Sequence, residues 1–314
     1  MTEESTDREE SGIVATRGEL LALGAARLAA PRRRVRRVGT RFAGTRASRF
    51  HGSGMEFSEV RAYQPGDDVR AIDWRVTART GRPHSKLFAE ERERPVWLVV
   101  DLGPSMHFGT RGAFKSVAAA RAAALLAWEA HGEGERVGGI VTTAACTVEL
   151  PPGRTRRTLL RFLDTLAQGT SAAGDGPGDT LEHQLSWLAL RVRSGSRVVV
   201  VSDFYAYDEG LALTLRVLAR RCGVTLVHVF DPLESTPPPA GRYRVSDGRE
   251  MRTVASGSGS AWQRAIAQPF EARSLALREL ARRHGMELVR LRTDEAPAAV
   301  LSSARRTVAS VGGA

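Results

Sequence analysis

Cysteine is scarce in this sequence, and its two copies lie far apart. Cys146 and Cys222 show no CxxC spacing, so the sequence predicts neither a disulfide framework nor a zinc site. We expect both thiols to be buried, as unpaired cysteines commonly are.

Long apolar runs are also lacking. The uncharged run at residues 137–148 is shorter than the roughly 20 residues that a membrane helix requires, and threonines interrupt it. The N-terminal stretch MTEESTDREE is acidic, whereas a secretory signal places positive charge before an apolar segment. We therefore expect a cytoplasmic protein without a membrane span.

Lysine is nearly missing from the basic residues. Lys86 and Lys115 are the only lysines among 46 Lys and Arg residues, and the net charge is +11. Such a balance can attract nucleic acid, but the arginines are scattered apart from the run PRRRVRR at residues 31–37, and no helix-turn-helix pattern accompanies them. A basic nucleic-acid-binding protein is therefore only an alternative, which steeply salt-dependent DNA binding would reveal.

The motifs of common enzyme chemistry are absent as well. The sequence has no P-loop lysine motif, no HExxH helix and no recognisable Ser-His-Asp set. An Asp at the end of a first strand is the nucleophile of haloacid-dehalogenase hydrolases, but that chemistry needs a second Asp two residues later, where Gly103 stands. We expect no enzymatic activity, with a metal-dependent phosphoryl-transfer hydrolase as the alternative.

What the sequence does contain is an alternation of apolar β-rich runs with helical patterns. Continuous apolar strands alternating with helices predict a doubly wound, mostly parallel α/β sheet that is covered on both faces. The expected strands are residues 96–101, 136–143, 146–150, 197–203, 224–230 and 286–291, and the expected helices are 18–28, 114–131, 155–168, 180–192, 211–222 and 261–284.

The composition along the chain predicts four segments. Residues 1–38 hold an acidic tail, a helix and the arginine-rich run, and residues 39–95 read as a small N-terminal β-rich subdomain of short strands and turns. The main α/β domain is expected at residues 96–292, with a hairpin insertion near 242–254, where an Asp-Gly turn joins β-rich flanks. Residues 293–314 form a C-terminal tail.

Two of the predicted strands end in aspartate. Asp101 closes VWLVVD, and Asp203 closes RVVVVSD. Ligands of open α/β sheets bind beyond the carboxyl ends of the strands, near the point where the strand order reverses. A buried carboxylate is costly unless it is compensated, and Ser105 in the following loop can add a hydroxyl oxygen. The pair therefore predicts a cation site at this edge of the sheet.

The same residues carry a resemblance. VVDLGPSM and VVVVSDF resemble the first and third metal motifs of the von Willebrand factor A fold, and the first of these motifs has the form Asp-x-Ser-x-Ser. Asp101 and Ser105 match it, but Gly103 replaces the first serine. The resemblance implies a Mg²⁺ held by serine hydroxyls and a loop threonine, with aspartates acting through water and an open position for a partner's carboxylate.

The implied threonine lies in the loop before the helix that precedes Asp203. Thr180 is our choice, and Asp179 is the alternative in register; either residue could instead cap the helix that follows. We expect a degenerate site that binds Mg²⁺ weakly or not at all, and we expect Gly103→Ser to tighten binding. Its predicted ligands are Asp101, Ser105, Thr180 and Asp203.

A second resemblance covers residues 54–101. This stretch resembles the signature of the bacterial family called domain of unknown function 58 (DUF58), which couples the segment to a von Willebrand factor A-like fold. The shared residues are Glu56, Phe57, Arg61, Tyr63, Pro65, Gly66, Asp67, Asp68, Arg70, Ile72, Asp73, Trp74, Ala78 and Arg79. Members are commonly encoded beside MoxR-type AAA+ ATPases, which implies that such an ATPase is the partner.

The leading prediction is a non-catalytic interaction or adapter module. It would partner a MoxR-type AAA+ ATPase, a client protein or both, in a chaperone-like or complex-maturation system. The signature segment would either present a docking surface or form a salt-bridged structural element packed on the main sheet. The candidate interaction residues are Arg61, Tyr63, Asp67, Asp68, Arg70, Asp73 and Trp74.

Overall fold

The chain folds into two compact units. The computed structural model describes residues 12–29, 55–64, 69, 72–90, 95–171, 179–236, 238–246, 251–257 and 261–303. One unit comprises Met1–Arg32 together with Arg94–Ala314, and the other comprises Arg33–Glu93. The smaller unit is therefore inserted into the sequence of the larger one.

The larger unit is built on a six-stranded sheet with the order β10-β7-β6-β3-β4-β5. All neighbouring strands are parallel except β4 and β5, which are antiparallel. The predicted doubly wound, mostly parallel sheet is thus confirmed. The strands are β3 (Val96–Leu102), β4 (Val137–Thr143), β5 (Thr147–Gly153), β6 (Arg197–Ser202), β7 (Gly223–Phe230) and β10 (Glu287–Arg292).

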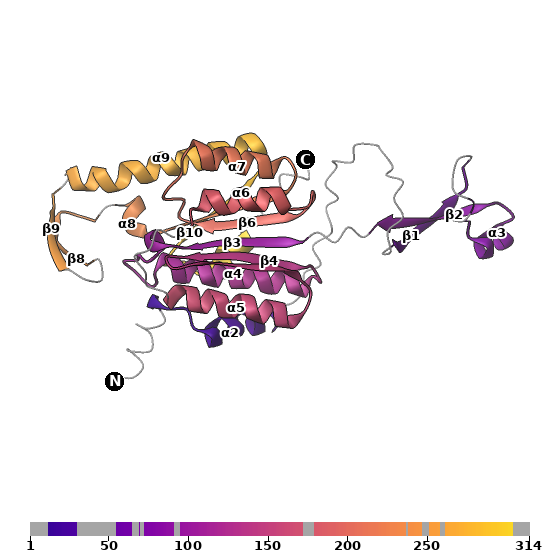
Figure 1. Ribbon diagram of the computed structural model, residues 1–314, viewed down its shortest axis with the longest axis horizontal. Helices are drawn as coiled ribbons and strands as arrows, with labels where there is room; N and C mark the ends of the chain where they lie inside the picture. The colour runs from indigo at the N-terminus through magenta and orange to yellow at the C-terminus, as the bar shows by residue number, and fades with distance from the viewer. Residues whose placement is uncertain are drawn as a thin grey trace. The chain divides into compact units, whose positions relative to one another are not determined.

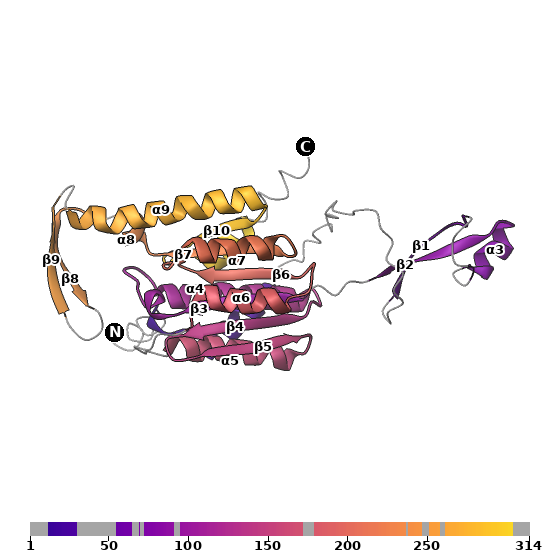
Figure 2. The ribbon, with the colours of Figure 1, turned by 45° about the horizontal axis from the view of Figure 1, so that its top comes forward.

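Helices cover both faces of this sheet, as Figures 1 and 2 show. Side chains alternate along β3, so that Leu98 and Val100 face the first layer while Trp97 and Val99 face the second. Burial on both faces explains why the strands read as continuous apolar runs. The first layer holds α2 (Arg17–Ala29), α4 (Lys115–Gly132) and α5 (Arg156–Ser171), and the second holds α6 (Leu181–Arg191), α7 (Glu209–Ala219) and α9 (Ala261–His284).

The strand order changes direction at one place in the sheet. From β3 the chain moves outward to β4 and β5, and it then returns to β6 on the other side of β3. The strand order therefore reverses between β3 and β6. This is the switch point where ligand sites of doubly wound folds form, and it is where the two predicted strand-end aspartates meet.

Helix α2 belongs to the larger unit, although the sequence placed it in a separate N-terminal segment. It packs on α4, whose alanine-rich sequence favours a helix and lets neighbours approach closely. Gly24 packs directly against the ring of Trp128. A Cβ atom at position 24 would come within 2.3 Å of Trp128 Cε2, so there is no room for a side chain. The Trp128 Nε1 also donates to the Leu20 carbonyl at 3.0 Å.

The remaining elements of this unit are short. They include a hairpin at the place expected from the Asp-Gly turn, residues 242–254, and the residues at 297–303 are helical. No helix in the described ranges is long and apolar enough to cross a membrane. These short elements are the 3-10 turn η2 (Pro104–Met106), α8 (Pro232–Ser235), β8 (Gly241–Ser246) and β9 (Met251–Ser256).

The two thiols differ in their surroundings. Cys222 is buried as expected, whereas Cys146 is exposed, so the expectation of a buried thiol was wrong for Cys146. Cys146 lies in the tight connection between β4 and β5, where the carbonyl of Cys146 accepts from the amide of Thr143. A side chain at such a surface turn has few buried neighbours to pack against.

The inserted unit contains an antiparallel pair, β1 (Met55–Ala62) and β2 (His84–Glu90). Between them lies a short helix, α3 (Trp74–Thr80), where the sequence predicted only strands and turns. Asp73 caps its first turn by accepting from two backbone amides, and Gly81 ends it with a left-handed φ of 72°. The rest of the predicted subdomain, residues 39–54, 65–68, 70, 71 and 91–94, lies outside the described residues.

The packing of α2 generates a prediction. Gly24→Ala forces a methyl group into the Trp128 ring and should lower the free energy of unfolding by about 1 to 3 kcal/mol. Gly18→Ala in the same helix is the matched control, because a Cβ at Gly18 would meet nothing closer than Thr16 Oγ1 at 4.0 Å. Urea denaturation measures both, and equal effects at the two glycines would contradict this packing.

Candidate functional site

The two strand-end aspartates lie beside each other at the switch point, as the sequence predicted from adjacent strand ends. Asp101 is near the end of β3, and its Oδ2 accepts from the Ser202 hydroxyl at 2.7 Å while its Oδ1 accepts from the Gly103 amide at 2.9 Å. Burial raises the pKa of Asp101 above its ordinary value, and the neighbouring charge of Asp203 raises it further.

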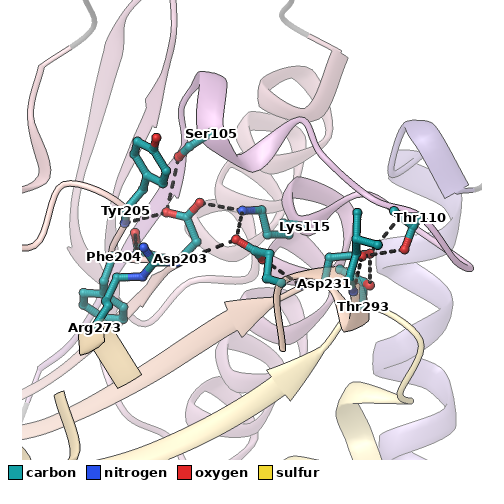
Figure 3. A network of polar contacts seen from close by, with 12 residues as sticks. Ser105, Thr110, Lys115, Asp203, Phe204, Tyr205, Asp231, Arg273 and Thr293 are labelled. Atoms are coloured by element: carbon teal, nitrogen blue, oxygen red, sulfur yellow. Dashed lines mark hydrogen bonds and ion pairs between the residues drawn. The ribbon is translucent and has the colours of Figure 1, made fainter. Parts of the chain in front are cut away.

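Asp203 is fully buried immediately after β6. Its Oδ1 accepts from the Tyr205 amide at 2.9 Å and from the Ser105 hydroxyl at 3.2 Å. Its Oδ2 accepts from the Lys115 ammonium at 2.7 Å, and Figure 3 shows the three donors converging on this carboxylate. The compensation that a buried carboxylate needs is therefore supplied by side chains and backbone of the chain itself.

Lys115 is the unexpected member of the site. It is the first residue of α4, and its side chain is only 3% exposed. The ammonium also lies 3.3 Å from Glu234 Oε1, and this same oxygen lies 3.6 Å from Arg273 Nη2. A positive charge at the start of a helix is opposed by the helix dipole, so the two carboxylates are what make the ammonium tolerable there.

A third strand-end carboxylate closes the site from the side of β7. Asp231 is fully buried and begins α8 with a capping box, in which Glu234 Oε2 accepts from the Asp231 amide at 2.8 Å. Asp231 Oδ2 accepts from the Thr110 amide at 2.8 Å and from the Thr293 hydroxyl at 2.9 Å (Figure 3). This carboxylate ties together the loops that follow β3, β7 and β10.

Sequence reasoning missed Lys115, Asp231 and Glu234. The available signal for Asp231 was the same as for its two counterparts, because the apolar run VTLVHVF also ends in an aspartate. The signal for Lys115 was its rarity in an arginine-rich chain.

The backbone beside Asp203 is strained. Phe204 has a φ of 51°, which is uncommon for a residue other than glycine, and its ring is buried. The Phe204 amide donates to the Ser202 hydroxyl at 2.9 Å, and the next amide donates to Asp203. The strained residue therefore turns the chain so that one amide donates to Ser202, the partner of Asp101, and the next amide donates to Asp203.

The structure gives Thr180, predicted as a metal ligand, a helix-capping role instead. Thr180 is exposed and begins α6, where its hydroxyl accepts from the His183 amide at 3.2 Å. Asp179 is exposed as well and lies 3.3 Å from the His183 ring. Ser105 donates a hydrogen bond to Asp203, and Ser202 donates one to Asp101. Within the described residues, no hydrogen bond links Thr180 to either aspartate.

The donor set around Asp203 does not fit a resident Mg²⁺. That ion demands several oxygen ligands at about 2.0 to 2.1 Å in octahedral geometry, whereas here the Lys115 ammonium lies against the carboxylates of Asp203 and Glu234. Across the described part of the chain, no group of three or more His, Cys, Asp or Glu residues could hold a metal ion.

Gly103 does not need the conformational freedom of glycine. Its φ of −68° and ψ of −178° are extended values that any residue adopts. A Cβ atom at this position would lie 3.0 Å from Asp101 Oδ1, so a serine requires only a small movement of that carboxylate.

The candidate interaction residues lie in the inserted unit. Trp74 is 70% exposed, Tyr63 is half-buried, and Asp73 is engaged in capping α3. Arg61 lies within β1. Three of the candidates fall outside the described residues: Asp67, Asp68 and Arg70.

His228 is fully buried, next to the Phe204 ring that follows Asp203. Its ring packs against the rings of Phe204, Phe230 and Phe270, and within the described residues neither ring nitrogen has a hydrogen-bond partner. Burial lowers the pKa of His228 to about 3, assisted by the positive charge of Arg273.

This pKa predicts how acid affects stability. The unfolded His228 binds a proton near its ordinary pKa of 6.5, whereas the folded one stays neutral down to about 3. Its contribution is therefore present above pH 6.5 and is lost as the pH falls toward 3, by about 1.4 kcal/mol per pH unit. Arg273, Arg290 and Lys115 oppose protonation, while Asp203 favours it.

In His228→Phe this loss should disappear, because the replacement ring has nothing to protonate. We would measure urea denaturation at about pH 7 and at about pH 4. Between these two conditions the unfolding free energy of the variant should decline less steeply than that of the wild type, by about 1.4 kcal/mol per pH unit. Parallel declines in the two proteins would contradict the buried neutral imidazole.

Comparison with known proteins agrees with the sequence resemblance. The family model described as "Protein of unknown function DUF58" matches residues 59–274. The uncharacterized proteins Mb1516 of Mycobacterium bovis and Rv1480 of Mycobacterium tuberculosis are each 32% identical over 243 residues, which cover 77% of this chain and 76% of theirs. A solved structure, "von Willebrand factor type A from Catenulispora acidiphila", is 10% identical with a TM-score of 0.35, over 71% of this chain and 43% of that chain. By the extent of the family match and by these relatives, the chain belongs to the DUF58 family.

Proposed function

We propose that this protein is a non-catalytic interaction module that partners a MoxR-type AAA+ ATPase, a client protein or both. The observation that carries the proposal is Trp74, a large aromatic side chain that is 70% exposed within the family-signature segment. Tryptophan is among the residues that most often dominate binding energy at protein interfaces. Its indole combines a large apolar area with a hydrogen-bond donor.

The backbone that carries Trp74 is held in place. Asp73 accepts from the Arg75 and Val76 amides at 3.0 and 3.2 Å, which fixes the first turn of α3. The Thr77 hydroxyl accepts from the His84 amide at 3.1 Å and so joins α3 to β2. A preorganised anchor loses little conformational freedom on binding, which favours affinity.

The surroundings of Trp74 suit a partner with an apolar and acidic surface. Val69, close to Trp74 in sequence, is 63% exposed. Arg75 and Arg79 on α3 are exposed as well. Neighbouring apolar and cationic side chains favour a partner surface of complementary character.

The strand-end site supports a non-catalytic role. A carboxylate nucleophile must be ionised and free to attack, but both oxygens of Asp101 accept hydrogen bonds and burial raises its pKa. Asp203 is likewise engaged by Lys115. These contacts argue against the phosphoryl-transfer alternative.

A phosphatase assay tests that alternative directly. With a chromogenic phosphate ester and Mg²⁺, we expect no turnover by the wild-type protein above that of Asp101→Asn, because the nucleophile is occupied. Turnover that depends on Asp101 would establish the hydrolase instead.

Trp74→Ala tests the interaction proposal. Since the side chain is exposed, thermal melts should stay close to those of the wild type, as for other surface substitutions that change stability by about 0.5 kcal/mol or less. Binding to the MoxR-type ATPase expressed from the same genome should weaken by about 2 kcal/mol, or roughly 30-fold.

Leu190→Ala is the matched control, because Leu190 is an 82% exposed apolar side chain on α6 of the larger unit. It should change neither stability nor binding. Failure of the wild type to associate with the ATPase in both the ATP and the ADP state would refute the proposed partner. A melting temperature that falls sharply in Trp74→Ala would instead favour a structural role for the segment.

A further inference from the structure

We propose that the ammonium of Lys115 is the resident cation of the strand-end site, so that this site works without Mg²⁺ and becomes a divalent-metal site when the ammonium is removed. The inference does not depend on the proposed ATPase partner. It concerns what occupies the space between the carboxylates at the switch point.

The geometry places the ammonium where a cation would bind. Lys115 Nζ lies 2.7 Å from Asp203 Oδ2 and 3.3 Å from Glu234 Oε1, and the lysine side chain is 3% exposed. The carboxylates come from the residue after β6 and from α8, so the lysine reaches from α4 to acidic groups on two other parts of the fold.

Ser105 is oriented consistently with an ammonium as the cation. Its hydroxyl donates a hydrogen bond to Asp203 Oδ1 at 3.2 Å. The Lys115 ammonium lies at 2.7 Å from the other oxygen of the same carboxylate, so a hydroxyl and an ammonium share Asp203. The motif serine is therefore present, but here it serves the carboxylate.

The charges balance along the chain of ion pairs, beside which Asp101 lies. Asp203 and Glu234 alternate with Lys115 and Arg273 in a continuous chain of ion pairs, in which two negative groups face two positive groups. A Mg²⁺ would add two positive charges beside a buried ammonium. Without the ammonium, Asp203 and Glu234 would lie near each other and near Asp101 with Arg273 as the remaining ion-pair partner of the chain, and buried like charges favour a bound cation.

The residue type supports the assignment. The chain uses arginine for all but two of its 46 Lys and Arg residues, yet position 115 is a lysine. An ammonium is a compact point charge with three donors, whereas a guanidinium is a wide planar fork. Only the compact group resembles a metal ion in shape.

Calorimetric titration with MgCl₂ after EDTA treatment tests the proposal. Wild type should show no saturable binding, and its melting temperature should be the same in EDTA and in Mg²⁺. Lys115→Met should gain saturable Mg²⁺ binding, at least tenfold tighter than any in the wild type, and should be stabilised by Mg²⁺. The double variant Lys115→Met with Asp203→Asn should lose this gain.

Two controls separate the ammonium from other causes. Lys86→Met makes the same change at the other lysine and should gain nothing. Gly103→Ser restores the motif serine but keeps the ammonium, so, in contrast to the expectation from the sequence motif alone, it should also gain nothing by itself.

The outcomes that overturn the proposal are definite. Saturable Mg²⁺ binding by the wild type, or a wild-type melting temperature that rises with Mg²⁺, would show that the ammonium does not replace the metal. A folded Lys115→Met without any gain would do the same. If Lys115→Met is unfolded in EDTA, recovery of its circular dichroism spectrum on adding Mg²⁺ supports the proposal. Absence of recovery, with no binding by Lys115→Gln, overturns it.

Discussion

The ion pair between Lys115 and Asp203 is the interaction on which the rest of the site depends. It joins the first residue of α4 to the end of β6 across 88 positions of sequence. Removing water from both charges is costly, and the pair persists because a backbone amide, a serine hydroxyl and a second carboxylate complete their hydrogen bonds. A substitution that removes one of the two charges would leave the other buried without its ion-pair partner.

The same lysine connects the two helix layers through Glu234. Lys115 belongs to the layer of α2, α4 and α5, while Arg273, which lies within ion-pair distance of Glu234, belongs to α9 in the opposite layer. Glu234 in α8 is the common acceptor between them. The edge of the sheet that ordinarily opens toward a ligand is therefore closed by charged groups of the protein. The strained Phe204, next to Asp203 in sequence, packs its buried ring against that of His228.

Much of the sheet unit could be predicted from the sequence, because doubly buried strands leave long apolar runs and helices leave a 3.6-residue period. The adjacency of Asp101 and Asp203 also followed, since carboxyl ends of parallel strands share an edge. What occupies the space between carboxylates did not follow. Lys115 begins an alanine-rich helix and reads as an ordinary surface residue, and its partners are distant in sequence. The short helix α3 was missed because seven residues are too few to show a period.

The insertion of one unit into the other has a mechanical consequence. The unit at Arg33–Glu93 leaves the sheet unit after α2 and returns to it just before β3. Tension applied through a partner bound to the inserted unit would divide between these two attachments. On one side it would load α2, which is seated on α4 by Gly24 under the Trp128 ring. On the other side it would load β3, a central strand hydrogen-bonded along both edges. A partner bound to the inserted unit is therefore connected through the backbone both to α2 and to the strand that carries Asp101.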